Sequence, residues 1–190
     1  MITEIETHYG MVQKQNLTRV HVPTERSIHR LVDELKREPR LLASRITPEG
    51  IAALLHTNRA VAFGTCSNSI HAFCALWSCK DPSWLELGTM FITETYRHRG
   101  VAQVLFQICD NLCPERKLFL ITAEPAVVAL AIKNGWRLEG NNWNGTGTFP
   151  WEEVIIGPLW ERYPPSCLKE PGLLLYRKAR PGKVVCWSGA

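Results

Sequence analysis

A chain of 190 residues with 45% hydrophobic and 21% charged residues is long and apolar enough to form a globular domain with a substantial core. The net charge of +4 suits an anionic ligand, but it is too small to indicate a nucleic-acid partner by itself. The basic residues are also dispersed along the chain, with no run that is typical of a basic tail.

The N-terminal ten residues include acidic side chains and no apolar h-region, so they do not predict a secretory signal. No apolar run approaches the roughly 18 residues that span a bilayer. We therefore expect a soluble, cytoplasmic protein with no membrane partner. The seven cysteines include no CxxC pair and the six histidines show no paired spacing, which predicts buried thiols in a reducing compartment and no metal site.

Hydrophobic periodicity predicts strands and helices in alternation. Thr24 is suited to cap a first helix, and Thr47 followed by Pro48 is typical of the start of a second. The expected elements are a strand at 17–22, helices after Thr24 and from Thr47 to about Asn58, strands at 59–66, 70–79 and 84–93, a helix from Val101 to Pro114, a strand at 117–122, a helix at 125–134, a strand from Trp136 and a closing strand at 172–178.

This order predicts one α/β domain over residues 1–190, with a mixed sheet and helices on both faces. Residues 140–171 interrupt it with many Gly and Pro residues and three tryptophans, which indicates an excursion with its own packing rather than a linker. Such a segment could wall an acceptor site as a lid. Alternatively, its tryptophans could fix the segment onto the sheet or into a homodimer interface.

The turn between the strand at 84–93 and the following helix is suited to hold a phosphate-bearing cofactor. It consists of Arg97, His98, Arg99, Gly100, Val101 and Ala102. A helix start leaves backbone N–H groups unpaired, and the helix dipole adds to their attraction for anions. Gly100 and Ala102 let a phosphate approach the backbone closely, and an arginine can bind phosphate through two parallel hydrogen bonds. The pattern is neither a Walker A loop nor GxGxxG.

The same six residues resemble the (Q/R)xxGx(G/A) signature of the GNAT superfamily of acyl-CoA-dependent N-acyltransferases. A strand precedes them, and an apolar-faced helix, a strand and a short helix ending in Gly135-Trp136 follow, where the family commonly has Gly-Phe. The element order from Leu17 to Lys178 is also similar. The resemblance implies the family's mixed, mostly antiparallel central sheet, and acetyl-CoA as co-substrate.

In terms of residues, the resemblance implies that backbone N–H groups of residues 98–102 hold the pyrophosphate of acyl-CoA. Pantetheine would pair with the strand backbone at Met90, Phe91 and Ile92. The N–H of Met90 would face the thioester oxygen and stabilise the oxyanion that develops during transfer. The acceptor would be a primary amine of a small molecule or of a protein, and the sequence does not identify it further.

Acyl transfer needs an amine free of its proton, so a general base or a water relay to one is required. The candidate is Glu86, which lies on the strand at the same offset before Arg97 at which several family members carry a glutamate base. Apolar neighbours such as Trp84 would raise its pKa, which suits a base. Strand alternation predicts Glu86, Gly88 and Met90 on one face, and Leu85, Leu87 and Thr89 on the other. The alternative is a solvent-facing charge.

Two positions depart from the family pattern. Ala131 stands where many members have a tyrosine as general acid, and Glu124 stands where many have an asparagine. Because a thiol pKa is near 8.5, a CoA thiolate can leave without that acid, or Tyr163 or Tyr176 could replace it. The departures also leave open a degenerate module that binds CoA or a partner protein without turnover, or a scaffold that uses the tryptophan surface alone.

Overall fold

The computed structural model describes residues 10, 12–38, 46–122, 124–140 and 173–177. The Trp-rich excursion predicted at 140–171 lies outside them except for its first residue, so its function stays a prediction. The helices and strands are β1 (Thr18–Arg19), α2 (Glu25–Arg37), α3 (Pro48–His56), β2 (Ala60–Cys66), β3 (Ser69–Ser78), β4 (Trp84–Ile92), the 3-10 turn η2 (Glu94–Tyr96), α4 (Val101–Leu112), β5 (Lys117–Thr122), α5 (Pro125–Lys133), β6 (Arg137–Gly140) and β7 (Leu173–Arg177).

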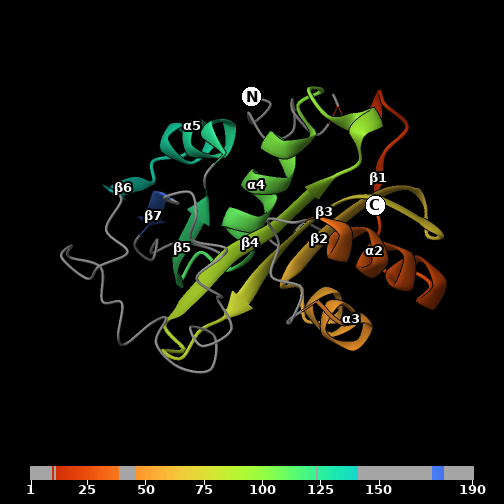
Figure 1. Ribbon diagram of the computed structural model, residues 1–190, viewed down its shortest axis with the longest axis horizontal. Helices are drawn as coiled ribbons and strands as arrows, with labels where there is room; N and C mark the ends of the chain where they lie inside the picture. Colours follow the sequence, from red (N-terminus) through yellow and green to blue (C-terminus); the bar gives the residue numbers. More distant parts are fainter. Residues whose placement is uncertain (1–9, 11, 39–45, 123, 141–172, 178–190) are drawn as a thin grey trace.

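The strands form one seven-stranded sheet in the order β1-β2-β3-β4-β5-β7-β6 (Figure 1). β4 and β5 are parallel, and the other neighbouring strands are antiparallel. β7, which is last in the chain, lies between β5 and β6. The predicted mixed, mostly antiparallel sheet is confirmed. The first strand is shorter than expected, because only Thr18 and Arg19 pair with β2 in the sheet.

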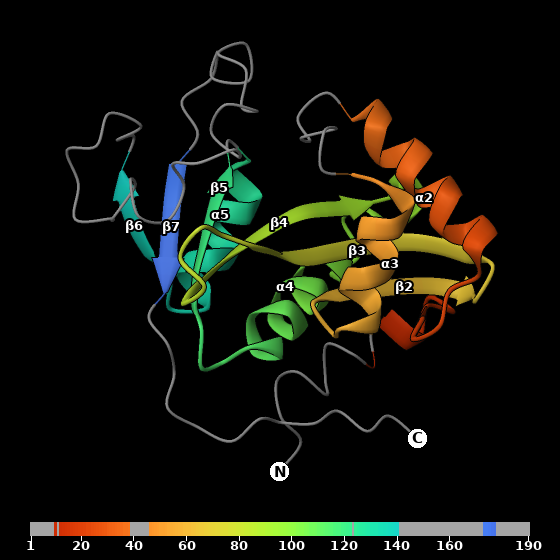
Figure 2. The ribbon, with the colours of Figure 1, turned by 90° about the horizontal axis from the view of Figure 1, so that it is seen from below.

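Helices cover both faces of this sheet, as predicted (Figures 1 and 2). Helices α2 and α3 pack on one face, where the buried residues of the α2–α3 core include Ile28, Leu31, Leu35, Ile51, Ala62, Phe73 and Phe91. Helices α4 and α5 pack on the other face, where the buried residues of the α4 core include Phe63, Leu76, Leu85, Leu87, Val104, Leu105, Leu118 and Ala131. The side chains of each strand therefore divide between two cores.

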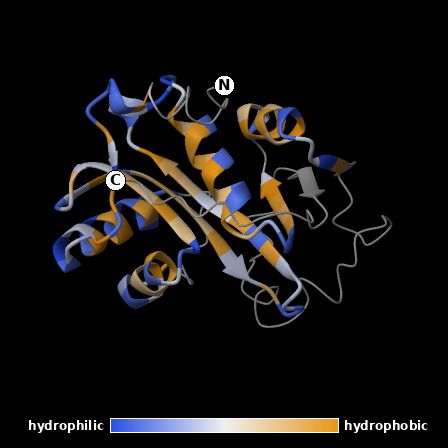
Figure 3. Ribbon diagram, turned by 180° about the vertical axis from the view of Figure 1, so that it is seen from behind, coloured by the Kyte–Doolittle hydropathy of each residue, from blue (hydrophilic) through white to orange (hydrophobic). Residues whose placement is uncertain are grey.

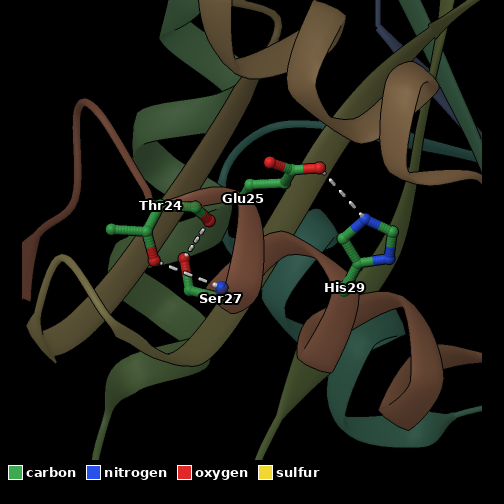
Figure 4. A network of polar contacts seen from close by, with 4 residues as sticks. All are labelled: Thr24, Glu25, Ser27 and His29. Atoms are coloured by element: carbon green, nitrogen blue, oxygen red, sulfur yellow. Dashed lines mark hydrogen bonds and ion pairs between the residues drawn. The ribbon is translucent and has the colours of Figure 1, made fainter.

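Threonine caps fix where α2 and α3 begin. The Thr24 hydroxyl accepts a hydrogen bond from the Ser27 N–H at 3.3 Å, and the Ser27 hydroxyl donates to the Thr24 carbonyl at 2.7 Å (Figure 4). The hydroxyl of Thr47 accepts from the Gly50 N–H at 3.1 Å. Each bond satisfies one of the N–H groups that a helix start leaves unpaired, so both predicted starts are confirmed.

The segment after α5 is fixed to α4 by a buried tryptophan. The Trp136 indole N–H donates to the carboxylate of Asp110 at 3.1 Å, and its ring lies 5.3 Å from that of Phe106. Asp110 is only 1% exposed, so this bond supplies a partner to a carboxylate that would otherwise be costly to bury. A phenylalanine at this position could not make it.

Candidate active site

The strands β4 and β5 run together over a short length and then part. Residues 84–86 of β4 are in register with residues 117–119 of β5. Beyond Glu86, β4 pairs with β3, while β5 continues beside β7. In Figure 2, β5, β7 and β6 run in a different direction from β2, β3 and β4. Among the residues that the structure describes, Glu86 thus lies where β4 ceases to have a paired strand on the side of β5 and its edge becomes open.

The open part of β4 contains a β-bulge. On either side of it, Ala75 pairs with Gly88 and Phe73 pairs with Phe91. Between these pairs β4 has two residues, Thr89 and Met90, against the single residue Cys74. Thr89 has a φ of 55°, a left-handed conformation that is rare for a β-branched residue.

The bulge makes the predicted alternation of side chains wrong from Thr89 onward. Leu85 and Leu87 lie in the α4 core, but Met90 and Ile92 pack against that same core instead of facing the side of Glu86. An extra residue on one strand shifts the alternation by one position, so every later side chain changes face. Glu86 and Met90, expected on one face, are therefore on opposite faces of β4.

Glu86 is 8% exposed, so the alternative of a solvent-facing charge is wrong. Its register partners are aromatic, Trp77 on β3 and Phe119 on β5. The ring of Phe119 meets that of Trp84 edge-on at 6.4 Å, and the Lys117 ammonium lies 5.3 Å from the centre of the Trp84 ring. The candidate base is thus a buried carboxylate among aromatic side chains.

The turn from β4 to α4 presents a row of backbone donors. His98 has a φ of 58°, and Gly100, the N-cap of α4, has a φ of 80°. Within the part of the chain that the structure describes, no group accepts a hydrogen bond from the backbone N–H groups of residues 98–102. The turn is also hydrophilic between two hydrophobic elements (Figure 3). Unpaired N–H groups at a helix N-terminus, with the exposed Arg99 beside them, fit a diphosphate.

Three side-chain bonds hold this turn in place. The Arg97 Nε donates to the Ile92 carbonyl at 2.9 Å, and its Nη2 lies 3.3 Å from the Glu38 carboxylate at the end of α2. The Gln15 amide donates to the Arg99 carbonyl at 2.8 Å. Sequence reasoning missed Gln15 and Glu38, because both lie far from the turn along the chain. It also gave Arg97 a contact with phosphate, which stays a prediction.

The backbone of Ile92 faces the open edge of β4. The Thr93 N–H donates to the His71 carbonyl on β3 at 2.9 Å. In an antiparallel pair the peptide groups of successive residues point alternately toward the partner and away from it, so those of Ile92 point away from β3. By the same alternation those of Phe91 point toward β3. The predicted contacts of Met90, Phe91 and Ile92 with pantetheine stay predictions.

Of the two positions that depart from the GNAT pattern, Ala131 lies within α5 and Glu124 lies at its start. Ala131 is fully buried in the α4 core, where it leaves no side chain to act as an acid. Glu124 is the exposed N-cap residue of α5. Tyr163 lies outside the described residues, and the backbone of Tyr176 on β7 pairs with Phe119.

Neither a family model nor a curated protein sequence matches the chain. Solved structures, by contrast, match it over most of its length. An acetyltransferase from Streptococcus agalactiae 2603 has a TM-score of 0.58 at 13% identity, over 86% of this chain and 99% of that one. A GNAT superfamily phosphinothricin acetyltransferase from Sinorhizobium meliloti, in complex with AcCoA, has a TM-score of 0.56 at 12% identity, over 88% and 91%. The chain has the GNAT fold.

The N-acetylglutamate synthase of Neisseria gonorrhoeae, complexed with coenzyme A and N-acetyl-glutamate, has a TM-score of 0.55 at 12% identity over 86% of this chain. The chain spans only 35% of the length of that synthase. The sequence resemblance to the GNAT superfamily is thus confirmed at the level of the fold. No group of three or more metal-binding side chains, and no helix long and apolar enough to cross a membrane, occurs among the described residues.

Proposed function

We propose that this protein transfers an acetyl group from acetyl-CoA to a primary amine, by direct attack in a ternary complex. The observation that carries the proposal is a row of N–H groups at residues 98–102 with no acceptor among the described residues, beside a strand edge that no described segment covers beyond Glu86. The N–H groups suit the phosphates of a long thioester and the open strand edge suits its chain. The buried carboxylate suits an amine that must lose a proton.

In this proposal the open edge of β4 orients the co-substrate. The N–H groups of residues 98–102 bind the pyrophosphate, and Arg97 and Arg99 add positive charge around it. The outward peptide groups of Ile92, with those of Met90, pair with pantetheine, whereas those of Phe91 point toward β3. The Met90 N–H donates to the thioester oxygen as negative charge develops on it, which lowers the barrier to attack.

Glu86 acts in this scheme as the general base. Its carboxylate takes a proton from the acceptor ammonium, directly or through one water molecule, which frees the nitrogen lone pair. The new C–N bond forms, the C–S bond breaks and the CoA thiolate leaves. Because that thiolate is a fair leaving group, the reaction does not depend on a tyrosine at the position of Ala131. The acceptor is an amine of a small molecule or of a protein.

Calorimetry with CoA and a thiol-release assay with acetyl-CoA over a panel of amines test the proposal. The panel should include polyamines, aminoglycoside-like compounds, amino acids and lysine-containing peptides. We expect CoA to bind and at least one amine to give turnover above the rate of hydrolysis. Failure to bind CoA at millimolar concentration would overturn the proposal.

A second candidate function is a module that binds CoA without turnover. The complete burial of Ala131 favours it, because the surrounding core closes the position at which related enzymes have an acid. Tight CoA binding with no thiol release on any amine of the panel would support this second function. Release that depends on both an amine and Glu86 would exclude it.

A further inference from the structure

Trp77 links the two parts of β4. In the register of β3 and β4 it lies directly across from Glu86. Its indole N–H donates to the hydroxyl of Thr89 at 2.9 Å, three residues further along β4 and within the bulge. Gly88, just before Thr89, has no side chain to obstruct the indole. The Trp77 side chain thus starts across from the candidate base and reaches the bulge.

The Trp77 bond is made to a residue that needs support. A non-glycine residue at positive φ is strained, most of all when it is β-branched, and persists only where surrounding contacts hold it. Thr89 is 6% exposed, so its hydroxyl has little access to water and depends on a protein donor. The indole supplies that donor.

The conformation of Thr89 determines which side of β4 each later residue faces. With the bulge, Met90 packs against the α4 core and Glu86 lies on the opposite face. Without it, the strand after Gly88 would slip by one residue, and the peptide groups facing the open edge would exchange with those facing β3. Ile92, which Arg97 contacts from the turn, would then lose its outward orientation.

We propose that Trp77 is a positioning residue of the acyl-transfer site, whose indole holds Thr89 in its left-handed conformation and so keeps the peptide groups of Met90 and Ile92 turned to the co-substrate. This inference rests on the proposed function for the identity of the ligand. It assigns Trp77 no contact with the substrate. Trp77 affects the reaction by holding the bulge in place.

Two pairs of variants separate this bond from ordinary packing. Thr89→Val removes the hydroxyl and keeps the β-branched shape, whereas Thr89→Ser keeps the hydroxyl. We expect Thr89→Val to lower kcat about tenfold, as for the loss of one buried hydrogen bond, with a smaller change in KM for acetyl-CoA. Thr89→Ser should stay within about twofold of the parent, since its hydroxyl still accepts the bond.

The decisive pair is Trp77→Phe in two backgrounds. Phenylalanine keeps an aromatic ring and lacks the donor, so Trp77→Phe alone should match Thr89→Val. Glycine adopts positive φ without support, so Trp77→Phe added to Thr89→Gly should change kcat by less than about twofold. An equal loss in both backgrounds, or a kcat within twofold for Trp77→Phe alone, would overturn the inference.

Amide hydrogen exchange over residues 88–92 gives a reading that needs no turnover. Exchange there should be faster in Trp77→Phe than in the parent, and should return toward the parent rate in the double variant with Thr89→Gly. Unchanged exchange in Trp77→Phe would contradict the proposed clamp. If the parent binds no CoA, the proposed function fails, and the exchange rates still decide whether Trp77 holds the bulge.

Discussion

The two parts of β4 differ in what lies beside them. Residues 84–86 have a strand on either side, β3 and β5, and their side chains are buried. Residues 89–92 contain the bulge, and within the described part of the chain their one sheet neighbour is β3. The first part holds a buried carboxylate with aromatic register partners, and the second presents peptide groups at an open edge. One strand therefore combines a rigid position for a base with a free edge for a ligand.

Removing the Glu86 carboxylate, from the part of β4 that has a strand on either side, should have the largest effect on the rate of acyl transfer. We expect Glu86→Gln to lower kcat by about a hundredfold, the low end of what a positioned base contributes. The loss should be steepest at low pH, where the acceptor amine is mostly protonated. Glu115→Gln is the control, because Glu115 is exposed and its carboxylate pairs with the neighbouring Arg116. A pH–rate profile that is unchanged in Glu86→Gln would remove Glu86 from this role.

The turn that follows the open part of β4 can be tested with two glycines that have the same positive φ. Gly100 and Gly135 both have a φ of 80°, at the start of α4 and after the end of α5. An alanine at either position should lower the free energy of unfolding by about 1 kcal/mol, because the added Cβ is strained there. Only Gly100→Ala should weaken CoA binding, by about tenfold, since it moves N–H groups in the turn.

Calorimetry and urea unfolding on both glycine variants measure these two effects separately. An equal loss of CoA affinity in the two variants would mean that the effect is one of stability alone. No loss of affinity in Gly100→Ala would mean that the turn does not bind the pyrophosphate through its backbone.

A smaller effect distinguishes the two arginines of the turn. Arg97→Lys keeps the charge and loses the bonds to Ile92 and Glu38, so we expect CoA affinity to fall by about threefold through a displaced turn. Arg99→Lys keeps the charge of an exposed side chain and should bind CoA nearly as well as the parent. No loss of CoA affinity in Arg97→Lys would show that Arg97 acts through its charge alone, and equal losses in the two variants would contradict a positioning role that is specific to Arg97.

Much of this fold follows from sequence patterns because each pattern has one strong local cause. Caps at Thr24 and Thr47, the apolar face of α4 and the nearly all-apolar strand β5 each predicted an element that the structure confirms. The candidate cofactor turn was predicted in the same way, from a glycine, arginines and a helix start in sequence, and its binding of CoA stays a prediction.

The bulge at Thr89 could not be found from local patterns. Threonine favours regular strands, and the bond that Thr89 accepts at its positive φ comes from Trp77 on another strand. The alternation rule applied to residues 85–90 therefore assigned Met90 to the wrong face. The bonds from Gln15 and Glu38 to the turn were missed for the same reason, because tertiary contacts join residues that no sequence window contains.

The smallest expected effect concerns His71, which lies across from the end of the open part. Its carbonyl accepts the Thr93 N–H at 2.9 Å, its Nε2 lies 2.6 Å from the Ser69 hydroxyl, and its ring is 5.0 Å from that of Tyr96. Burial lowers the pKa of His71 below 6.5, and the nearby Glu34 carboxylate opposes this only in part. Folding therefore favours the neutral imidazole.

The stability that depends on neutral His71 is complete above pH 6.5, the ordinary pKa of the side chain, and is lost as the pH falls below it. Urea unfolding at pH 7.5 and 5.5 should show a smaller pH-dependent loss in His71→Gln than in the parent. His21→Gln serves as a comparison, because burial and the charge of Arg19 lower the pKa of His21 in the same direction. If the bond to Thr93 transmits the change, acid should speed amide exchange at residues 90–93 more than at residues 84–86. Equal acceleration in both parts of β4 would show that protonation of His71 destabilises the whole sheet and not its open edge.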